Sequence, residues 1–527
     1  MTSTSRNITP LESQSSRVIG FSWGLLLLSF SIGCLTIYWG GVFTDEADIL
    51  VIGSLLSRQN LLYRDLFSHH FPFPYYWMAV VVNIFGRSIF LARLSIWLFQ
   101  IVSFAIAMKM SRFHLPLAIS AFVWGILRPL YLGNMVLYSS FSGTSLMVVF
   151  VITLAILQRK KLATWKDGLV IGLFSAISVL SDPFSALAVT VALLFLLALN
   201  LRHGALSSFF AASGILLFTG YLLASGTFQA FWQNPVLFNM HIYSKYLGES
   251  NQVTRIFEFF QMAGKGLEAT NRIWLNFDPL KPITGGYSEF DQWFFTGFLY
   301  RVGLIIGAIF LILKKKYRAA LFIYLFAAAT LVISKWGFRG QPFFITALVA
   351  ISAIIIGEWR YLENRYLDTG QTTARILLGA MILWLILRVV DHYYVNQDML
   401  TYEANFAWTD YEAYRIKSLT CNQPEVQLAY YPGGTYLHWP TKMKPVSKYI
   451  YMWPWVAEVG LSDVIDGLSQ DRILAVVIRY DDLIWGYDTK DYMQPLDEYL
   501  NREYKKAVEG VYLSPRLFEI CRRLGDK

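Results

Sequence analysis

Asp45, Glu46 and Asp48 are the most conspicuous chemical groups of the sequence, because these three carboxylates directly follow its first long apolar segment. Ionised acids beside membrane hydrocarbon are costly unless a cavity solvates them or they serve a function. A structural explanation exists as well, since Thr44 or Asp45 can cap a helix and acids are favourable in the first helical turn. The spacing alone leaves the functional and the capping interpretations open.

A second polar cluster follows in the same part of the chain. It contains Asp65 and then the adjacent pair His69 and His70, which precede a run of prolines and aromatic residues. A histidine can bind a divalent metal ion or a phosphate oxygen. Neighbouring residues on a helix point about 100° apart, so two adjacent histidines cannot easily share one ion there. We therefore expect at most one of them in a site; a divalent metal is possible, but no cofactor is assigned.

Four further polar residues stand at breaks between apolar segments. Asp182 precedes Pro183, where it either joins a site or caps the helix that the proline begins. Lys335 and Arg339 lie in one short connection, where they either contact an anionic group or snorkel to the membrane interface. Lys245 belongs to a stretch of aromatic and basic residues, which is typical of either a binding groove or an interfacial aromatic belt.

The composition indicates a membrane protein. Of the 527 residues, 55% are hydrophobic and 15% are charged, whereas soluble domains are usually about 45–50% apolar. The apolar residues form segments long enough to cross about 30 Å of hydrocarbon as helices. We expect about eleven transmembrane helices, at 18–40, 88–108, 115–133, 135–157, 168–181, 183–201, 206–226, 293–313, 318–334, 341–357 and 376–395.

The loops predict which side of the membrane each connection faces. Basic clusters at 158–161 and 314–318 lie in short loops and should be cytoplasmic, provided that the short apolar segment 72–86 lies along the outer surface instead of spanning. The N-terminus is then cytoplasmic, and the loops 41–87 and 227–292 face outward. Because the basic residues lie between apolar segments, the net charge of +9 indicates contact with membrane lipids and no nucleic-acid partner.

Residues 396–527 differ from the apolar part, 1–395, because charged residues occur throughout them. We expect a small extracytoplasmic α/β domain there, with Ser514-Pro515 turning its last two strands into a hairpin. Cys421 and Cys521 either form a disulfide, as an oxidising compartment permits, or remain two unlinked buried thiols. The predicted strands are Val426–Tyr431, Ile473–Tyr480, Ala507–Leu513 and Arg516–Cys521, and the predicted helices are Trp455–Leu468 and Tyr492–Tyr504.

Residues 38–95 carry a resemblance to a known family. An Asp-Glu pair follows the first helix, and a Tyr-Arg-Asp step, a cluster of His, Pro and aromatic residues, a Phe-Gly turn and an Ala-Arg-Leu helix start come after it. This layout resembles the GT-C membrane glycosyltransferases, nearest to the branch of protein O-mannosyltransferases and the aminoarabinose transferase of lipid A. The rest of the chain agrees with that family in the order of helices and outer domain.

The resemblance implies a polytopic α-helical GT-C fold and a sugar donor linked to polyprenyl phosphate. It implies that Asp45 is the catalytic general base, with Glu46 beside it, and that Lys335 and Arg339 meet the departing phosphate. The sequence departs from the family between Tyr131 and Gly143, where a second acid is absent and Asp182 could replace it. The acceptor can be a lipid, a glycan or a protein, and the expected location is the bacterial inner membrane.

Two other functions are compatible with a polytopic membrane protein. A transporter or flippase of lipid-linked or small polar substrates would place ionisable or helix-breaking groups at mid-membrane and show internal repeats. The apolar segments are nearly free of acids, and the two halves of the sequence show no repeat. A non-catalytic partner in envelope glycan synthesis is the third possibility. The sequence therefore favours the glycosyltransferase.

Overall fold

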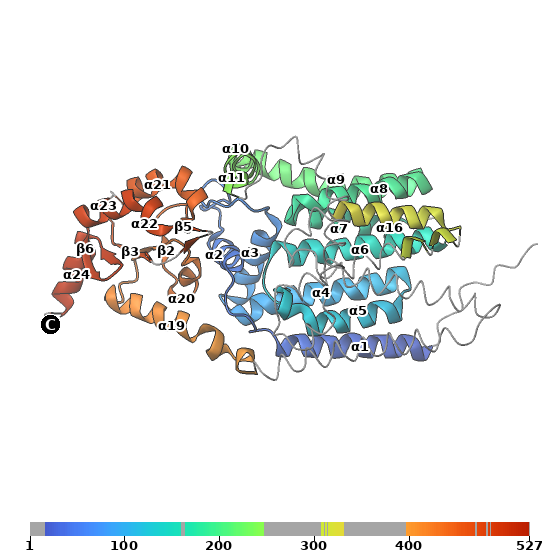
Figure 1. Cartoon of the computed structure of the whole chain (residues 1–527), viewed down its shortest axis with the longest axis horizontal. Helices are drawn as coiled ribbons and strands as arrows, with labels where there is room; N and C mark the ends of the chain where they lie inside the picture. Colours follow the sequence, from blue (N-terminus) through green and yellow to red (C-terminus); the bar gives the residue numbers. More distant parts are fainter. Residues whose placement is uncertain are drawn as a thin grey trace, which may run out of the picture.

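The computed structural model describes residues 16–159, 164–246, 307–330 and 397–525, with short gaps at 310, 314, 469–471, 481–482 and 485. Its long apolar helices run side by side in one bundle, as Figure 1 shows. The bundle helices are α1 (Ser16–Leu35), α4 (Ile89–Ser111), α5 (His114–Leu127), α6 (Tyr138–Arg159), α7 (Trp165–Ser181), α8 (Ala186–Leu199), α9 (Leu201–Ala224) and α16 (Tyr317–Thr330).

Burial separates the centre of the bundle from its periphery. Within the described residues, four helices are long and apolar enough to cross a membrane: Val18–Leu35, Ile89–Ser111, Tyr138–Gln158 and Leu201–Ala224. In an apolar 18-residue window of Tyr138–Gln158, 94% of the residues are buried inside the protein. The corresponding shares are only 22% for Val18–Leu35 and 17% for Leu201–Ala224. Helix α6 is therefore the centre, and α1 and α9 present apolar side chains outward, as helices that face lipid do.

The expected helices of the first 226 residues agree with these bounds to within a few residues at most ends. Glycines allow some of them to approach closely, as is common between transmembrane helices. A Cβ atom added to Gly172 of α7 would lie 2.4 Å from the Cβ of Phe210 of α9. The expected helices at 341–357 and 376–395, and most of 293–313, lie outside the described residues.

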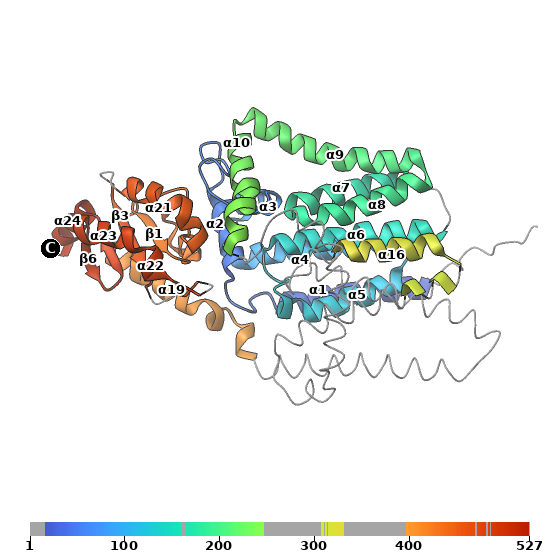
Figure 2. The same ribbon diagram turned by 45° about the horizontal axis from the view of Figure 1, so that its top comes forward.

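Two helices of the first loop lie at one end of the bundle, next to the C-terminal domain (Figures 1 and 2). They are α2 (Thr44–Leu55) and α3 (Phe73–Phe85). Helix α3 has 13 residues, which at about 1.5 Å per residue is too short to cross about 30 Å of hydrocarbon. This length agrees with the predicted surface helix at 72–86.

The helical segment after α9 turns across the same end of the bundle, as Figure 2 shows. It consists of α10 (Phe228–Phe231), the π-helix Trp232–Tyr243 and α11 (Ser244–Tyr246). Asn234 Nδ2 donates a hydrogen bond of 2.8 Å to the carbonyl of Tyr63, and Asn239 Nδ2 donates one of 2.6 Å to the carbonyl of His69. These amides fasten the segment to the first loop.

The C-terminal residues form an α/β domain with a five-stranded sheet in the order β2-β1-β3-β7-β6. Strand β1 pairs in parallel with β2 and β3, and β7 pairs antiparallel with β3 and β6. The strands are β1 (Gln427–Tyr431), β2 (Lys444–Pro445), β3 (Leu474–Ile478), β6 (Lys505–Val508) and β7 (Val511–Leu513), and a separate pair comprises β4 (Leu483–Ile484) and β5 (Tyr487–Asp488).

Helices cover both faces of this sheet. Val476 packs in one hydrophobic cluster with residues of α21 (Pro454–Leu468) and α23 (Gln494–Glu503). Val477, which points to the opposite face, packs with residues of α19 (Tyr402–Leu419) and α24 (Pro515–Gly525). A strand buried on both faces needs a continuous apolar run, which is what residues 474–478 provide.

The predicted strand at Arg516–Cys521 is wrong, because these residues belong to helix α24. Ser514 Oγ accepts the N–H of Leu517, and Pro515 occupies the first helical position. The hairpin turn lies earlier, between β6 and β7, where Gly510 adopts a φ of +70°. The disulfide Cys421–Cys521 also joins helix α24 to the second residue after α19, so the first of the two cysteine alternatives is confirmed.

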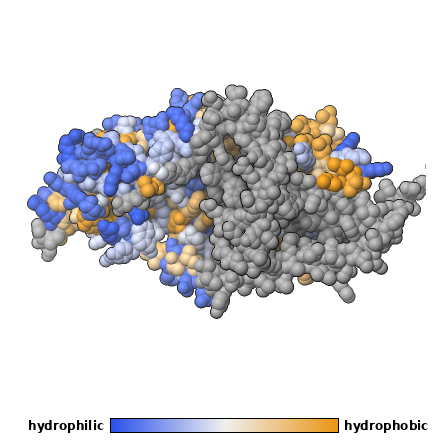
Figure 3. All heavy atoms as spheres, in the orientation of Figure 1, coloured by the Kyte–Doolittle hydropathy of each residue, from blue (hydrophilic) through white to orange (hydrophobic). Residues whose placement is uncertain are grey.

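Surface polarity follows the same division as the fold. Figure 3 shows hydrophilic residues gathered over the C-terminal domain and hydrophobic residues on the described part of the bundle. Exposed side chains of the bundle include Phe21, Leu98 and Leu217. A large apolar surface of this kind requires lipid as its solvent. The chain is thus a polytopic helical membrane protein that carries a polar α/β domain at one end of its bundle.

Candidate functional site

Helix α2 directs its three carboxylates to different surroundings. The helix begins at Thr44 after Phe43, and no side chain caps it, so the capping role considered for Thr44 or Asp45 is wrong. Asp45 and Glu46 occupy the first turn, where the helix dipole favours acids. Since consecutive helical residues diverge by about 100°, Asp45 is half-buried whereas Glu46 and Asp48 are fully enclosed.

Glu46 forms a buried ion pair with Arg93 of α4. Arg93 Nη2 lies 2.6 Å from Glu46 Oε2, and Arg93 Nε donates to Glu46 Oε1 at 2.9 Å. Both side chains are fully shielded from solvent. The N–H of Val136, in the loop before α6, donates to Glu46 Oε1 at 3.0 Å. The carboxylate therefore joins the first loop, α4 and the α5–α6 connection.

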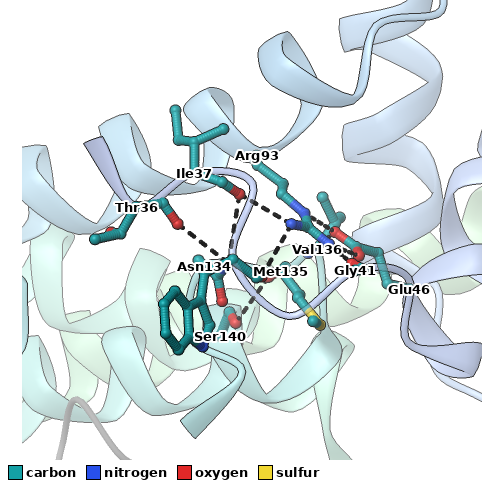
Figure 4. A network of polar contacts seen from close by, with 10 residues as sticks. Thr36, Ile37, Gly41, Glu46, Arg93, Asn134, Met135, Val136 and Ser140 are labelled. Atoms are coloured by element: carbon teal, nitrogen blue, oxygen red, sulfur yellow. Dashed lines mark hydrogen bonds and ion pairs between the residues drawn. The ribbon is translucent and has the colours of Figure 1, made fainter. Parts of the chain in front are cut away.

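Arg93 also holds the backbone that leads from α1 into α2. Figure 4 shows its guanidinium between Glu46 and the carbonyls of Ile37 and Gly41. Asn134 supports the same stretch of chain, because its amide donates to the carbonyl of Trp39 at 2.7 Å. Two buried polar side chains from separate elements thus fix the start of α2 and, with it, the position of Asp45.

Asp45 stands where the first loop meets the C-terminal domain. Its neighbours include Asp48 on the same helix and Tyr451 in the C-terminal domain, and its charge contributes to raising the pKa of each. Burial is the larger cause of the raised pKa of both groups. A half-buried carboxylate beside such groups can accept a proton from a ligand that enters from the polar side.

Asp48 is buried, with 3% of its surface exposed. Its Oδ2 accepts a hydrogen bond from the hydroxyl of Tyr75, and the hydroxyls of Tyr75 and Ser68 lie 2.6 Å apart. Burial raises the pKa of Asp48 to about 8; the hydrogen bond from Tyr75 opposes this shift, and the nearby Asp45 adds to it. Asp48 therefore carries a proton at neutral pH.

His69 and His70 form a bend between the first loop and α3, which we name the histidine turn. The expectation that only one of them fits a site assumed a helix, but the residues are not helical and their ring centroids lie 4.0 Å apart. His69 Nδ1 lies 2.8 Å from the hydroxyl of Tyr451. The ring of His70 stacks on Tyr138 at 4.9 Å. Both rings therefore lie in the junction that contains Asp45.

Three other predicted site residues have local partners, and two of them lie near the surface. Asp65 is half-exposed and accepts hydrogen bonds from the N–H of Leu61 and from Arg64. Lys245 is exposed and pairs with Glu458 of α21 at 3.2 Å. These contacts stabilise a turn and the docking of the π-helical segment.

Asp182, the third, is buried between α7 and the 3-10 turn that follows it. Its Oδ1 accepts the N–H of Phe184 at 3.0 Å, which is the geometry of a cap for the helix that Pro183 begins. This agrees with the capping interpretation. Lys335 and Arg339 lie outside the described residues.

An open pocket of about 300 Å³ lies beside the histidine turn. Phe67 of the first loop, Phe238 and His241 of the π-helix and Tyr449 of the C-terminal domain are among its lining residues. Within the part of the chain that the structure describes, no three His, Cys, Asp or Glu side chains gather as metal ligands would. The pocket is therefore lined by aromatic, aliphatic and polar groups from three separate segments of the chain.

Sequence reasoning gave no individual role to several residues that shape this junction. Arg93 carried a usable signal, since a charged residue near the start of an apolar segment is expensive unless it is paired. Tyr75 and Tyr451 carried none, because tyrosine is common throughout this sequence. Asn134 lies between Tyr131 and Gly143, a segment that the sequence singles out only because it lacks an acid.

Comparison with solved structures shows the fold of this chain, which is the fold of GT-C membrane glycosyltransferases. This chain is similar to the solved structure of ArnT from Cupriavidus metallidurans bound to undecaprenyl phosphate. The TM-score is 0.54 at 12% sequence identity, and the match covers 95% of this chain and 98% of the ArnT chain. The apo state of ArnT gives a TM-score of 0.53 at 13% identity with the same coverage. The GT-C fold predicted from residues 38–95 is thereby confirmed.

A more distant likeness is to the oligosaccharyltransferase AglB from Archaeoglobus fulgidus in complex with an inhibitory peptide and a dolichol-phosphate. Its TM-score is 0.45 at 13% identity, with coverage of 87% of this chain and 69% of that one. No protein-family model matches the sequence, and no curated protein matches it. The similarity of this chain to ArnT is therefore a similarity of fold, at low sequence identity.

Proposed function

We propose that this protein is a membrane glycosyltransferase that moves a sugar from a polyprenyl-phosphate donor to an acceptor on the extracytoplasmic face, with Asp45 as general base. The observation that carries this proposal is the position of Asp45. It is half-buried at the junction of bundle and polar domain, at the start of a helix held by the buried Glu46–Arg93 pair. The fold supports it, since the ArnT structure of the same fold contains undecaprenyl phosphate.

The proposed reaction needs one ionised carboxylate. The acceptor hydroxyl gives its proton to Asp45 as its oxygen bonds to the anomeric carbon of the sugar, and the bond from that carbon to the phosphate oxygen breaks. The polyprenyl phosphate leaves with the electron pair of that bond. A retaining scheme would require a second ionised acid about 5 Å away as nucleophile, whereas the neighbouring Asp48 is protonated at neutral pH. We therefore propose a single step that inverts the anomeric centre.

The other residues would act through binding and position. Glu46 touches Arg93 and Val136, so we assign it the placement of α2 instead of a proton transfer. We propose that Lys335 and Arg339 neutralise the charge that grows on the departing phosphate. The C-terminal domain would bind the acceptor, whether lipid, glycan or protein. In this arrangement the N-terminus is cytoplasmic, the domain is outside and the membrane is the bacterial inner membrane.

The test is transfer by the purified protein in nanodiscs, assayed with a panel of radiolabelled polyprenyl-phosphate sugars. Asp45→Asn should abolish transfer and keep the fold, because the amide is nearly isosteric but cannot take the proton. Asp463→Asn, at a surface pair with Lys448, is the matched control and should remain active. Full activity of a folded Asp45→Asn variant would refute the assigned base. Labelling of a cysteine at position 45 only from the cytoplasm would refute the topology.

A further inference from the structure

We propose that Asp48 is a positioning residue for Asp45: it keeps its own proton at neutral pH and, through Tyr75 and Ser68, ties helix α2 to the histidine turn. The proposal rests on the proposed function of Asp45. Asp48 itself need not touch the substrate. Asp48 acts on Asp45, one helical turn before it, by influencing the charge around that carboxylate and its position.

The hydrogen bonds define the direction of this link. Tyr75 has one hydroxyl proton, which it donates to Asp48 Oδ2, so the neighbouring hydroxyl of Ser68 must donate to Tyr75. Ser68 Oγ also accepts the N–H of His70 at 3.0 Å. An unbroken chain therefore runs from Asp48 to the backbone of the histidine turn. A displacement of the histidine turn would therefore displace α2, and a displacement of α2 would displace the histidine turn.

The burial and the hydrogen-bond partners of Asp48 favour its neutral, protonated form. Its Oδ1 is buried and has no hydrogen-bond partner among the described residues. A buried carboxylate normally requires several donors or a cation, and Tyr75 is the donor that the contacts provide. Other titratable groups that interact with Asp48 include Asp45 on its own helix, Tyr63 in the first loop and Tyr451 in the C-terminal domain.

Two basic groups near α2, Arg93 and His438, offer no free positive charge to Asp48. The guanidinium of Arg93 is already paired with Glu46. Helix α20 (His438–Thr441) packs against α2, and its His438 is uncharged at neutral pH, since burial lowers the pKa of that imidazole to about 4. The preceding 3-10 turn contributes Tyr436, whose pKa is raised by burial. None of these three groups supplies a cation that would favour the ionised form of Asp48.

The charge state of Asp48 has a consequence for an anionic donor. Below about pH 8 Asp45 is the single negative group of this pair. Above it, two carboxylates one helical turn apart both carry charge, and the added charge repels a phosphate that binds nearby. The KM for the donor should therefore rise above about pH 8 in the wild-type protein. In Asp48→Asn, which keeps an acceptor for Tyr75 but cannot ionise, that rise should be absent.

The first experiment needs no substrate. Infrared difference spectra of the full chain in nanodiscs, recorded against Asp48→Asn, should contain the carbonyl band of a protonated carboxylic acid at pH 7, lost with a midpoint of about pH 8. Tyr75→Phe should move that midpoint upward, because the hydrogen bond from Tyr75 favours the ionised form. If Tyr75 only filled space, Tyr75→Phe would instead let water reach Asp48. The ionisation midpoint of Asp48 would then fall. A carboxylate band of Asp48 at pH 7 overturns the proposal.

The second experiment measures the KM for the donor against pH in the wild type, in Asp48→Asn and in the surface control Asp463→Asn. An alkaline rise that persists in Asp48→Asn overturns the proposal, and its loss only in that variant supports it. Failure of the proposed function is distinguishable from failure of this inference. If no polyprenyl-phosphate sugar is turned over, or if Asp45→Asn remains active, the proposed function fails while the infrared midpoints still decide the state of Asp48.

Discussion

Replacing Glu46 with glutamine should destabilise the protein strongly even though the two side chains have nearly the same shape. Glu46 and Arg93 are both fully shielded from solvent. The new amide would keep one acceptor but would point N–H groups at a guanidinium that has only donors. The other hydrogen bonds of Arg93 go to neutral carbonyls, those of Ile37, Trp39 and Gly41, and its guanidinium lies over the uncharged ring of Phe406. Its charge would thus remain buried without a counter-charge.

The size of the effect follows from burial. Removing one member of a buried ion pair typically costs about 3–5 kcal/mol, because the other charge stays uncompensated. The matched control is Asp65→Asn, which breaks the pair of Arg64 and Asp65, whose side chains are 47% and 30% exposed. An exposed pair is worth about 0–1 kcal/mol. The free energies of unfolding should therefore differ by at least about 2 kcal/mol between the two variants.

Equilibrium unfolding in mixed micelles measures both variants under the same conditions. A double-mutant cycle with Arg93→Met identifies the cause, since loss of both charges should cost much less than the sum of the single changes. If Glu46→Gln unfolds like Asp65→Asn, or if the cycle shows no coupling, the pair does not hold α2 and the positioning role of Glu46 is refuted.

Three further outcomes are expected. Cys421→Ser should destabilise the C-terminal domain by about 4–5 kcal/mol in the loop-entropy model, because the disulfide closes a 100-residue loop; in the wild type, thiol labelling under denaturing, non-reducing conditions should modify Cys34 alone. Gly172→Ala should lower the thermal midpoint, since its Cβ would clash with α9, whereas Gly220→Ala, with open space around it, should not. Tyr451→Phe, which removes the bond to the histidine turn, should reduce transfer and leave the unfolding midpoint of the domain nearly unchanged.

Much of the bundle is predictable because a transmembrane helix is encoded locally. Helices α4, α6 and α9 each come from one uninterrupted apolar segment, and length alone fixes their identity. The break at Asp182 is local as well, since an acid followed by proline ends one helix and caps the next. Helix α24 was mistaken for a strand because a short segment such as Arg516–Cys521 fits both periods; the capping hydroxyl of Ser514 decides for the helix.

The site is less predictable, because its contacts join distant parts of the chain. The sequence shows Asp45 and Glu46 as neighbours of the same type, and only the partner Arg93, which lies 47 residues further on, distinguishes a buried structural acid from a half-exposed one. The contact of His69 with Tyr451 spans 382 residues. Neither a motif nor a hydropathy pattern predicts such a pair, so the role of the C-terminal domain in the junction had to come from the structure.

The arrangement of these contacts explains why the acids of the first loop tolerate their place beside the membrane. Each is accommodated differently: Glu46 by a paired charge, Asp48 by a retained proton and Asp45 by partial access to solvent. Of the three, only Asp45 is partly open to a ligand. This difference supports the proposed role of Asp45 as general base, with the two buried acids as the proposed means of holding its helix between the bundle and the polar domain.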